Sequence, residues 1–344
     1  MIECVFTLDY ELYGNGTGAL QTLVYEPAQR LADVFLRRGA RFVVFVEAAE
    51  LEKIDECRSD DGIDSVKRQV KEFSQEGFEI GLHLHPQWCN AYYDNAKWFL
   101  DISEYNICTL PQARIAQVVE RAISYLRGLL DEPDFTPLSF RAGNWLFQPT
   151  EAAAAVLADC GIKLDSSVFK GGLQHNNTLD YRQSMKNGYY WPFRRDVNEP
   201  DPAGPCFELP IYTEMVPSWR LLTAKRLGSG NTYGNAGRSI RQRANRMRDF
   251  MRFRYPLKLD FSRMALKELT SMMGRIIQHD QRQPVLFRPI VAIGHTKDMP
   301  DPGVVDGFLS FLSDSGIAVS TFEKVYPRLL EQMDDPLPSL RAMA

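Results

Sequence analysis

Cysteine and histidine are scarce in this chain, which holds six and five of them among 344 residues. No two cysteines are spaced as a CxxC pair, and in a chain without a visible secretion signal this predicts free thiols. The cysteines are Cys4, Cys57, Cys89, Cys108, Cys160 and Cys206.

Segments that direct a protein into or across a membrane are also missing. No run of 18 apolar residues occurs, so we expect no membrane span. The opening residues MIECVFTLDYELYG have neither a basic n-region nor a long apolar h-region, so we expect no secretory signal and a cytoplasmic location. The net charge of −4 is mild and gives no reason to expect a nucleic-acid partner.

What the chain does contain is an ordinary globular composition, with 44% hydrophobic and 24% charged residues. Short runs rich in strand-forming residues recur along it, and several are apolar throughout, as strands buried on both faces tend to be. These runs are residues 4–9, 40–46, 78–84, 137–142, 162–168, 207–212, 289–295 and 316–322.

Helical patterns lie between these strands. The first has Pro27 near its start and Gly39 just past its end, and the second has Asp64 as a candidate N-cap and Gly77 as its stop. The predicted helices are residues 26–39, 64–77, 110–130, 149–161 and 302–316.

Strands that alternate with helices predict βαβ units and a parallel sheet. Seven or eight such strands favour a closed or nearly closed barrel, with an open doubly wound sheet as the alternative. In a barrel the active site lies at the carboxyl ends of the strands. We expect one domain over residues 1–335, with a flexible tail over 336–344.

A basic segment interrupts the pattern at residues 219–258, where Asp249 is the single acidic residue. We interpret it as an insertion formed by a glycine-rich loop and a basic helix. A solvated helical face explains such a composition, and so does contact with an anionic substrate or a lipid headgroup.

Polar residues at the predicted strand ends indicate the chemistry. Asp9 and Glu11 follow the first strand, and His83 and His85 follow the third; side chains two apart on a strand share a face. Three further strands end in polar residues, with an aromatic residue in one of the following loops. These residues are Arg141, Trp145, Asp165 and His295.

Histidine and carboxylate ligands around an open position are typical of a catalytic divalent-metal site, most often zinc. A carboxylate near such a metal can take a proton from water, a histidine can return one to a leaving group, and Arg141 can keep the carboxylate ionised. The set therefore suits hydrolysis of an amide or ester carbonyl. His175 and His279 lie in polar contexts and are interpreted as structural.

Five motifs, in order along the chain, resemble those of the polysaccharide deacetylases of the NodB-homology type, from about residue 3 to residue 325. They are FTLDYE, GFEIGLHLH, SFRAGNW, LADCGIKLDSSVF and AIGH. The resemblance implies a distorted (β/α) barrel of about seven parallel strands, a divalent metal, and removal of acetyl groups from N-acetylated sugars.

Carried over by position, Asp9 matches the catalytic base of that family, His83 its first metal histidine, Arg141 the residue that positions the base, and His295 the general acid. The commonest pattern has a second aspartate where this chain has Tyr10, and a second histidine where it has Gln87. Strand alternation favours Glu11 and His85 as ligands in their place, with Asp9 as a possible further ligand.

We therefore predict a metal-dependent deacetylase in surface-polysaccharide biosynthesis, with zinc as the metal. The expected substrate is a carbohydrate contacted by Trp145, Asp165 and Tyr10, with an anionic or diphosphate-linked sugar as an option. Peripheral membrane contact is an option for the basic segment. Two alternatives stay open. One is a hydrolase of a non-sugar amide or a glycosidic bond, and the other is a non-catalytic saccharide-binding protein.

Overall fold

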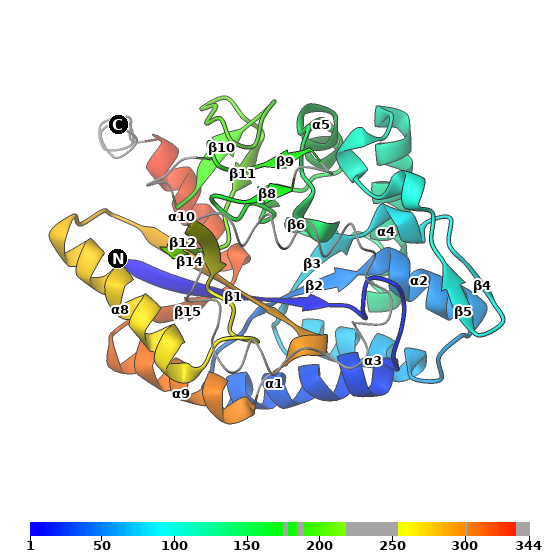
Figure 1. Ribbon diagram of the computed structural model, residues 1–344, viewed down its shortest axis with the longest axis horizontal. Helices are drawn as coiled ribbons and strands as arrows, with labels where there is room; N and C mark the ends of the chain where they lie inside the picture. The colour runs from blue at the N-terminus through cyan, green and yellow to red at the C-terminus, as the bar shows by residue number, and fades with distance from the viewer. Residues whose placement is uncertain (175–177, 185–188, 218–253, 300, 335–344) are drawn as a thin grey trace.

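A computed structural model describes residues 1–174, 178–184, 189–217, 254–299 and 301–334. Its centre is a curled, mostly parallel sheet with helices packed on its outside (Figure 1). Both the strands and the covering helices come from segments that alternate along the chain, which confirms the predicted α/β barrel class.

The main sheet contains nine strands among the described residues, in the order β10-β11-β7-β6-β3-β2-β1-β14, with β15 beside β1. All its pairings are parallel except that between β10 and β11. The strands are β1 (Ile2–Tyr10), β2 (Val43–Glu47), β3 (Glu79–Leu84), β6 (Ser139–Ala142), β7 (Leu164–Asp165), β10 (Trp191–Phe193), β11 (Cys206–Glu208), β14 (Arg288–His295) and β15 (Ala318–Ser320).

Isolated parallel bridges join the two ends of this sheet. Ile211, just after β11, bridges Val291 of β14, and Asp260 bridges Ile293 of the same strand. The sheet therefore curls back on itself, and the open doubly wound alternative is wrong. Short two-stranded sheets lie outside it: β4 (Tyr92–Asp94) with β5 (Lys97–Phe99), β8 (Leu173–Gln174) with β9 (Leu179–Asp180), and β12 (Thr213–Pro217) with β13 (Arg254–Lys258).

The helices form the outer layer and contact one another in succession around the sheet (Figure 1). The sequence predicted five of them to within a few residues, and it missed α2, α8 and α10. The helices are α1 (Glu26–Arg37), α2 (Ala48–Cys57), α3 (Ile63–Gln75), α4 (Gln112–Leu130), α5 (Glu151–Asp159), α8 (Leu266–Arg282), α9 (Pro302–Asp314) and α10 (Phe322–Asp334). None in the described part of the chain has the length and apolar character needed to cross a membrane.

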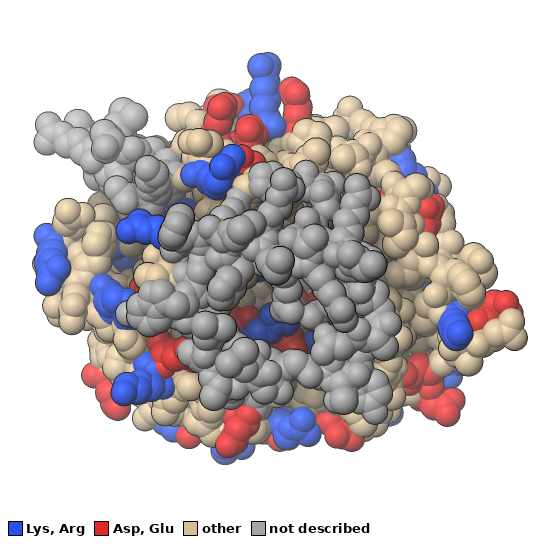
Figure 2. Space-filling model, viewed as in Figure 1, with Lys and Arg blue, Asp and Glu red and all other residues tan. Residues whose placement is uncertain are grey.

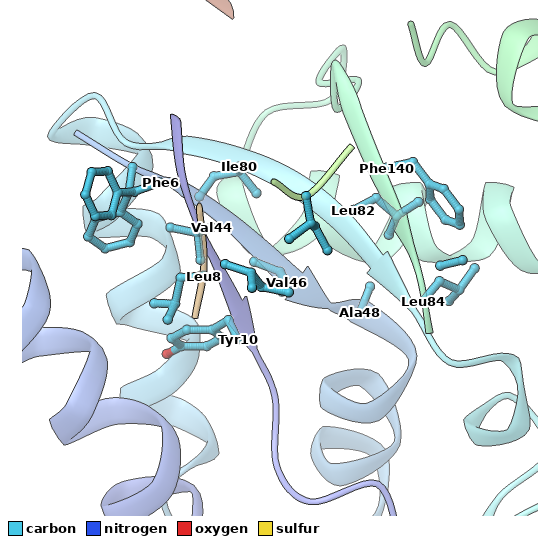
Figure 3. Packing of buried hydrophobic residues seen from close by; sticks show 14 of the residues in the cluster. Phe6, Leu8, Tyr10, Val44, Val46, Ala48, Ile80, Leu82, Leu84 and Phe140 are labelled. Carbon is cyan, nitrogen blue, oxygen red and sulfur yellow. The ribbon is translucent and has the colours of Figure 1, made fainter. Parts of the chain in front are cut away.

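Alternation along each strand divides the core into two layers. Phe6, Leu8 and Tyr10 of β1 lie with Val44 and Leu82 among the apolar residues of the helix-facing layer (Figure 3). The intervening residues face the interior, where a smaller cluster includes Val5, Val43, Phe45, Phe207 and Val291. Because Asp9 continues the Val5 side of β1, it points into the barrel above this apolar plug.

The predicted basic insertion lies mostly outside the described residues, since residues 218–253 are not among them. Its last five residues are described, and they form strand β13 instead of the end of a helix. Val216 pairs with Tyr255 in the resulting hairpin-like sheet, where β12 and β13 run antiparallel. The predicted tail over 336–344 also lies outside the described residues.

Candidate active site

Strand register brings the polar strand-end residues together at one end of the barrel. Asp9 of β1 is the register partner of His295 in β14, and His83 of β3 is the partner of Arg141 in β6. Glu11 and His85 each follow the last residue of β1 or β3, on the same inward side. Six of the predicted residues therefore converge although they lie far apart in the chain: Asp9, Glu11, His83, His85, Arg141 and His295.

Glu11, His83 and His85 have the geometry of a metal-ligand set. The Oε2 atom of Glu11 lies 3.5 Å from Nε2 of His83 and 3.1 Å from Nε2 of His85. Tetrahedral zinc with bonds of about 2.0–2.1 Å places its ligand atoms roughly 3.3 Å apart. All three residues are at least 95% buried, so the donors fit a divalent cation held away from bulk water.

The hydrogen bonds of the two imidazoles fit the same purpose. Nδ1 of His83 donates to the carbonyl of Arg141 at 2.9 Å, which leaves the lone pair of Nε2 directed toward Glu11. Nδ1 of His85 lies 3.1 Å from the amide nitrogen of Gln87, whose buried Oε1 has no partner among the described residues. The amide nitrogen of Asn144 also lies near Nδ1 of His85, at 3.3 Å. With the Gln87 amide turned by half a turn, its Oε1 accepts from Nδ1–H of His85, and both imidazoles then present a free Nε2.

Glycine is required at position 143 because the His85 ring packs against it. A Cβ atom there would lie 2.6 Å from Cγ of His85 and 2.8 Å from the carbonyl oxygen of Leu84. The GNW turn after β6 thus fixes one face of the second histidine.

A half-buried lysine binds the other carboxylate oxygen of Glu11. Nζ of Lys297 donates to Oε1 of Glu11 at 2.7 Å and to the carbonyl of Leu12 at 2.9 Å. Burial by itself raises the pKa of Glu11, but Lys297 and the two histidines outweigh it and hold that pKa well below its usual range. Glu11 is therefore ionised, and its Oε2 atom faces the Nε2 atoms of His83 and His85.

Asp9 lies beside this set in a second ion pair, with Nη1 of Arg141. Burial raises the pKa of Asp9, but Arg141 and His295 bring it below its ordinary value. Nε2 of His295 is 3.3 Å from Oδ2 of Asp9, and burial lowers the pKa of this histidine. An ionised carboxylate next to a neutral imidazole is an arrangement suited to proton transfer.

Two more buried carboxyl groups support the site, and sequence analysis missed both. Glu47, the last residue of β2, accepts from the backbone N–H groups of His85, at 2.7 Å, and Glu50. Glu50 accepts from the backbone N–H of Leu12 at 2.7 Å. Burial and the negative charge of Glu11 raise the pKa of Glu50 to about 8. The strand-end rule used for Asp9 would have found Glu47, because it ends the run FVVFVE.

The three predicted substrate contacts lie in different places. Tyr10 points to the helix-facing layer, where its hydroxyl donates to Oε1 of Gln69 at 2.7 Å and its ring is fully buried (Figure 3). This position corrects the prediction, because a residue on the outside of the sheet does not reach a substrate in the barrel. The alternation that turns Asp9 and Glu11 inward turns Tyr10 outward.

Asp165 is at the predicted strand end but is enclosed. It accepts from the hydroxyl and the backbone N–H of Ser167 and is the register partner of Glu208 in β11. Burial raises the pKa of both carboxyl groups, and each also affects the other. One shared proton between them accounts for the Oε2 atom of Glu208, which otherwise has no partner in the described part of the chain. Asp165 thus lies within the wall of the barrel.

Trp145 does lie at the site, in a turn where both it and Asn144 have positive φ, at 59° and 55°. Its ring meets that of His295 edge-on, with centroids 6.1 Å apart. Sequence analysis missed Lys258, whose Nζ lies 3.0 Å from the centroid of the Trp145 ring. The sequence offers only weak signals for the two lysines: Lys297 is a basic residue two positions after His295, and Lys258 is the last residue of the basic insertion. Among the predicted structural histidines, His279 lies in α8 near Arg288, and His175 falls outside the described residues.

No family model and no curated protein matches this sequence. The structure, by contrast, is similar to solved structures assigned to the polysaccharide deacetylases. One, from Mycobacterium smegmatis, has a TM-score of 0.53 at 12% identity, covering 96% of this chain and 91% of that one. Another, from Pseudomonas aeruginosa PAO1, has a TM-score of 0.52 at 11% identity, covering 94% and 89%.

A different enzyme shares the fold to the same degree. The GH57-type branching enzyme from Pyrococcus horikoshii has a TM-score of 0.53 at 12% identity, covering 94% of this chain and 70% of that one. The comparisons therefore confirm the deacetylase-like barrel at the level of the fold, and the chemistry has to be argued from the site.

Proposed function

We propose that this protein is a metal-dependent hydrolase that removes the acetyl group from an N-acetylated saccharide. The observation that carries the proposal is the buried set of Glu11, His83 and His85 directly beside the Asp9–Arg141 ion pair and His295. Its members match the positions expected from the deacetylase motifs, with Glu11 and His85 in place of the commoner ligands.

Glu11, His83 and His85 would hold the divalent cation through Oε2 and the two Nε2 atoms. A cation bound there would polarise the acetamide oxygen and lower the pKa of water in the site. Lys297 keeps Glu11 ionised and turned so that one oxygen remains available.

Asp9 acts as the general base in this proposal. Its carboxylate is ionised, and Arg141 fixes it through a guanidinium that also donates to Thr7 Oγ1 and to the backbone carbonyl and hydroxyl of Ser166. Asp9 takes a proton from the water that attacks the acetamide carbon. Asp9 passes this proton to Nε2 of His295, which lies 3.3 Å from its Oδ2, and His295 delivers it to the departing amine. Nδ1 of His295 has no partner among the described residues.

Hydrolysis of a glycosidic bond is the competing function, since a branching enzyme shares the fold. That reaction usually requires two carboxyl groups free to act as an acid and as a base or nucleophile. Here Oε1 of Glu11 is bound by Lys297, and Oε2 faces two histidines. This pairing favours a ligand role for Glu11 and hence the deacetylase.

The test combines metal analysis with an acetate-release assay. Protein purified without chelator should contain about one divalent ion per chain and release acetate from an N-acetylated saccharide. The His83→Ala/His85→Ala double variant should lose both. Stoichiometric metal with cleavage of glycosidic bonds and no acetate would favour the competing hydrolase. If metal neither copurifies nor binds on addition, the non-catalytic saccharide-binding alternative is favoured. Zinc as the metal, cytoplasmic location, peripheral membrane contact and a biosynthetic role stay predictions.

A further inference from the structure

Lys258 lies at the rim of the site on a well-fixed backbone. It ends β13, is the register partner of Thr213 in β12, and precedes Leu259, which exchanges backbone hydrogen bonds with Tyr212 and Ile293. Ile293 is two residues before His295 in β14. These bonds fix the main chain at the base of Lys258 close to the catalytic end of the barrel.

Aromatic rings hold its ammonium in place. Nζ lies 3.0 Å from the ring centroid of Trp145 and 4.0 Å from that of Phe169. These rings meet each other edge-on at 5.5 Å, and Trp145 meets His295 at 6.1 Å. Lys258 and His295 therefore both contact the ring of Trp145. It also covers a face of Trp145 that would otherwise be available to stack on a sugar.

No carboxylate in the described part of the chain forms an ion pair with this ammonium, because the nearby acids are committed elsewhere. Asp9 is held by Arg141 and lies 3.3 Å from His295. Oδ1 of Asp260 accepts from the hydroxyl and backbone N–H of Ser262. Burial lowers the pKa of Lys258 well below its usual value, and the attraction of Asp260 and Asp9 does not offset it.

The charges around the site are otherwise matched. Lys297 is paired with Glu11, Arg141 with Asp9, and Arg263 with Asp298. Lys258 therefore stands out as a half-buried basic group without an anionic contact among the described residues, and a nearby anion would favour its charged form. A cation in this state gains most from a ligand that brings a negative charge to it.

We propose that Lys258 is the specificity residue for an anionic substituent, a phosphate or a carboxylate, on the saccharide whose acetamido group is cleaved. This inference rests on the proposed function for the identity of the sugar. The cation–π contacts keep the ammonium in position before the ligand arrives, so little side-chain entropy is lost on binding.

The experiment compares matched sugars on the metal-loaded full-length protein. N-acetylglucosamine is the neutral member, and its 1-phosphate, its 6-phosphate and the corresponding 6-uronate are the anionic members. At least one anionic sugar should be preferred by about 10-fold or more, seen in kcat/KM if acetate is released and in Kd by calorimetry if it is not. Which member gains tells a phosphate from a carboxylate.

Variants then assign the preference to Lys258. Lys258→Met should lower kcat/KM or affinity about 10-fold more for the preferred anionic sugar than for the neutral sugar, and Lys258→Arg should retain most of the preference. Lys324→Met is the matched control, because Lys324 is exposed on α10 at the opposite end of the sheet. At that end the backbone N–H of Glu323 donates to the carboxylate of Glu79.

Several outcomes would overturn the inference. If the wild-type protein uses or binds the neutral sugar no worse than each anionic sugar, the inference is wrong, and this result does not depend on whether any variant folds. An equal loss on neutral and anionic sugars in Lys258→Met would assign Lys258 to a step common to all substrates. Absence of acetate release is a failure of the proposed function only, because calorimetry still measures the preference.

Discussion

Arg141 and Asp9 form a buried ion pair, in which the arginine is 0% and the aspartate 2% exposed to solvent. The guanidinium is held against the Phe45 ring, 4.2 Å from its centroid, and by hydrogen bonds to Thr7 and Ser166. A charged pair this deep in a barrel is costly unless all its hydrogen bonds are made. Its position beside Glu11, His83 and His85 supports the role of general base that we propose for Asp9.

Asp9→Asn tests the base directly. The amide keeps the shape of the side chain but cannot accept a proton, so turnover should fall by about 10²–10⁴-fold. Metal content, measured by elemental analysis, should stay near that of the wild-type protein. Loss of metal together with activity would instead make Asp9 a ligand.

The ligand set is tested by replacing one donor at a time. His83→Ala, His85→Ala and Glu11→Gln should each weaken metal binding, because each removes a donor from a site with three protein ligands. Competition with a chromogenic chelator measures the affinity. His279→Ala is the control, since its imidazole lies near Arg288 and outside this set; a similar loss there would point to general damage.

Substitutions at Gln87 should change metal affinity in opposite directions. Gln87→Glu should tighten binding because a carboxylate accepts from Nδ1–H of His85 and makes the imidazole a better donor. Gln87→Leu should weaken it by roughly 10–100-fold, which is typical for the loss of such a partner. If both variants bind like the wild-type protein, the tautomer assigned to His85 is wrong. Thermal unfolding of the metal-free variants controls for core damage.

Gly143→Ala should have a similar effect by a steric route. The added methyl group would meet the His85 ring and the backbone at Leu84. We expect weaker metal binding and lower turnover in a protein that still folds. Gly128→Ala is the matched control because a Cβ atom there meets nothing within 4 Å. Unchanged affinity in Gly143→Ala would show that the ring can move without cost.

Stability should fall as pH rises through the neutral range because of Glu79, at the amino end of β3. Burial raises its pKa to about 8 despite hydrogen bonds from Ser139 and from the backbone of Glu323. The folded state therefore holds a proton that the unfolded chain releases near its ordinary pKa of about 4.3.

The contribution of protonated Glu79 to the free energy of unfolding is complete below the pKa that Glu79 has in the unfolded chain. It is lost as pH rises through the pKa of Glu79 in the folded protein, with a slope of at most about 1.4 kcal/mol per pH unit. Denaturant unfolding of Glu79→Gln from pH 5 to 9 should show a flatter profile than that of the wild-type protein. Parallel profiles would mean that Glu79 ionises normally. Glu120→Gln on α4 is the control, because this carboxyl group is exposed to solvent.

Local pattern predicted much of this architecture. Apolar runs gave the parallel strands, and proline, glycine and cap residues gave five of the helices. Alternation also predicted that Asp9 and Glu11 share a face, and the structure places both inside the barrel. The same rule, applied to Tyr10, would have placed it on the opposite face, where it is found. Tyr10 was assigned as a substrate contact because it stands in the FTLDYE motif.

Other features depend on contacts between distant segments. Neither the pairing of Lys297 with Glu11, nor the position of Lys258 on Trp145, nor the coupling of Asp165 to Glu208 has a local signal. The sequence by itself determined which side chains end each strand and which way they point, because strand geometry is local. Only the closure and register of the sheet decided which of them meet, because those depend on packing across the whole barrel.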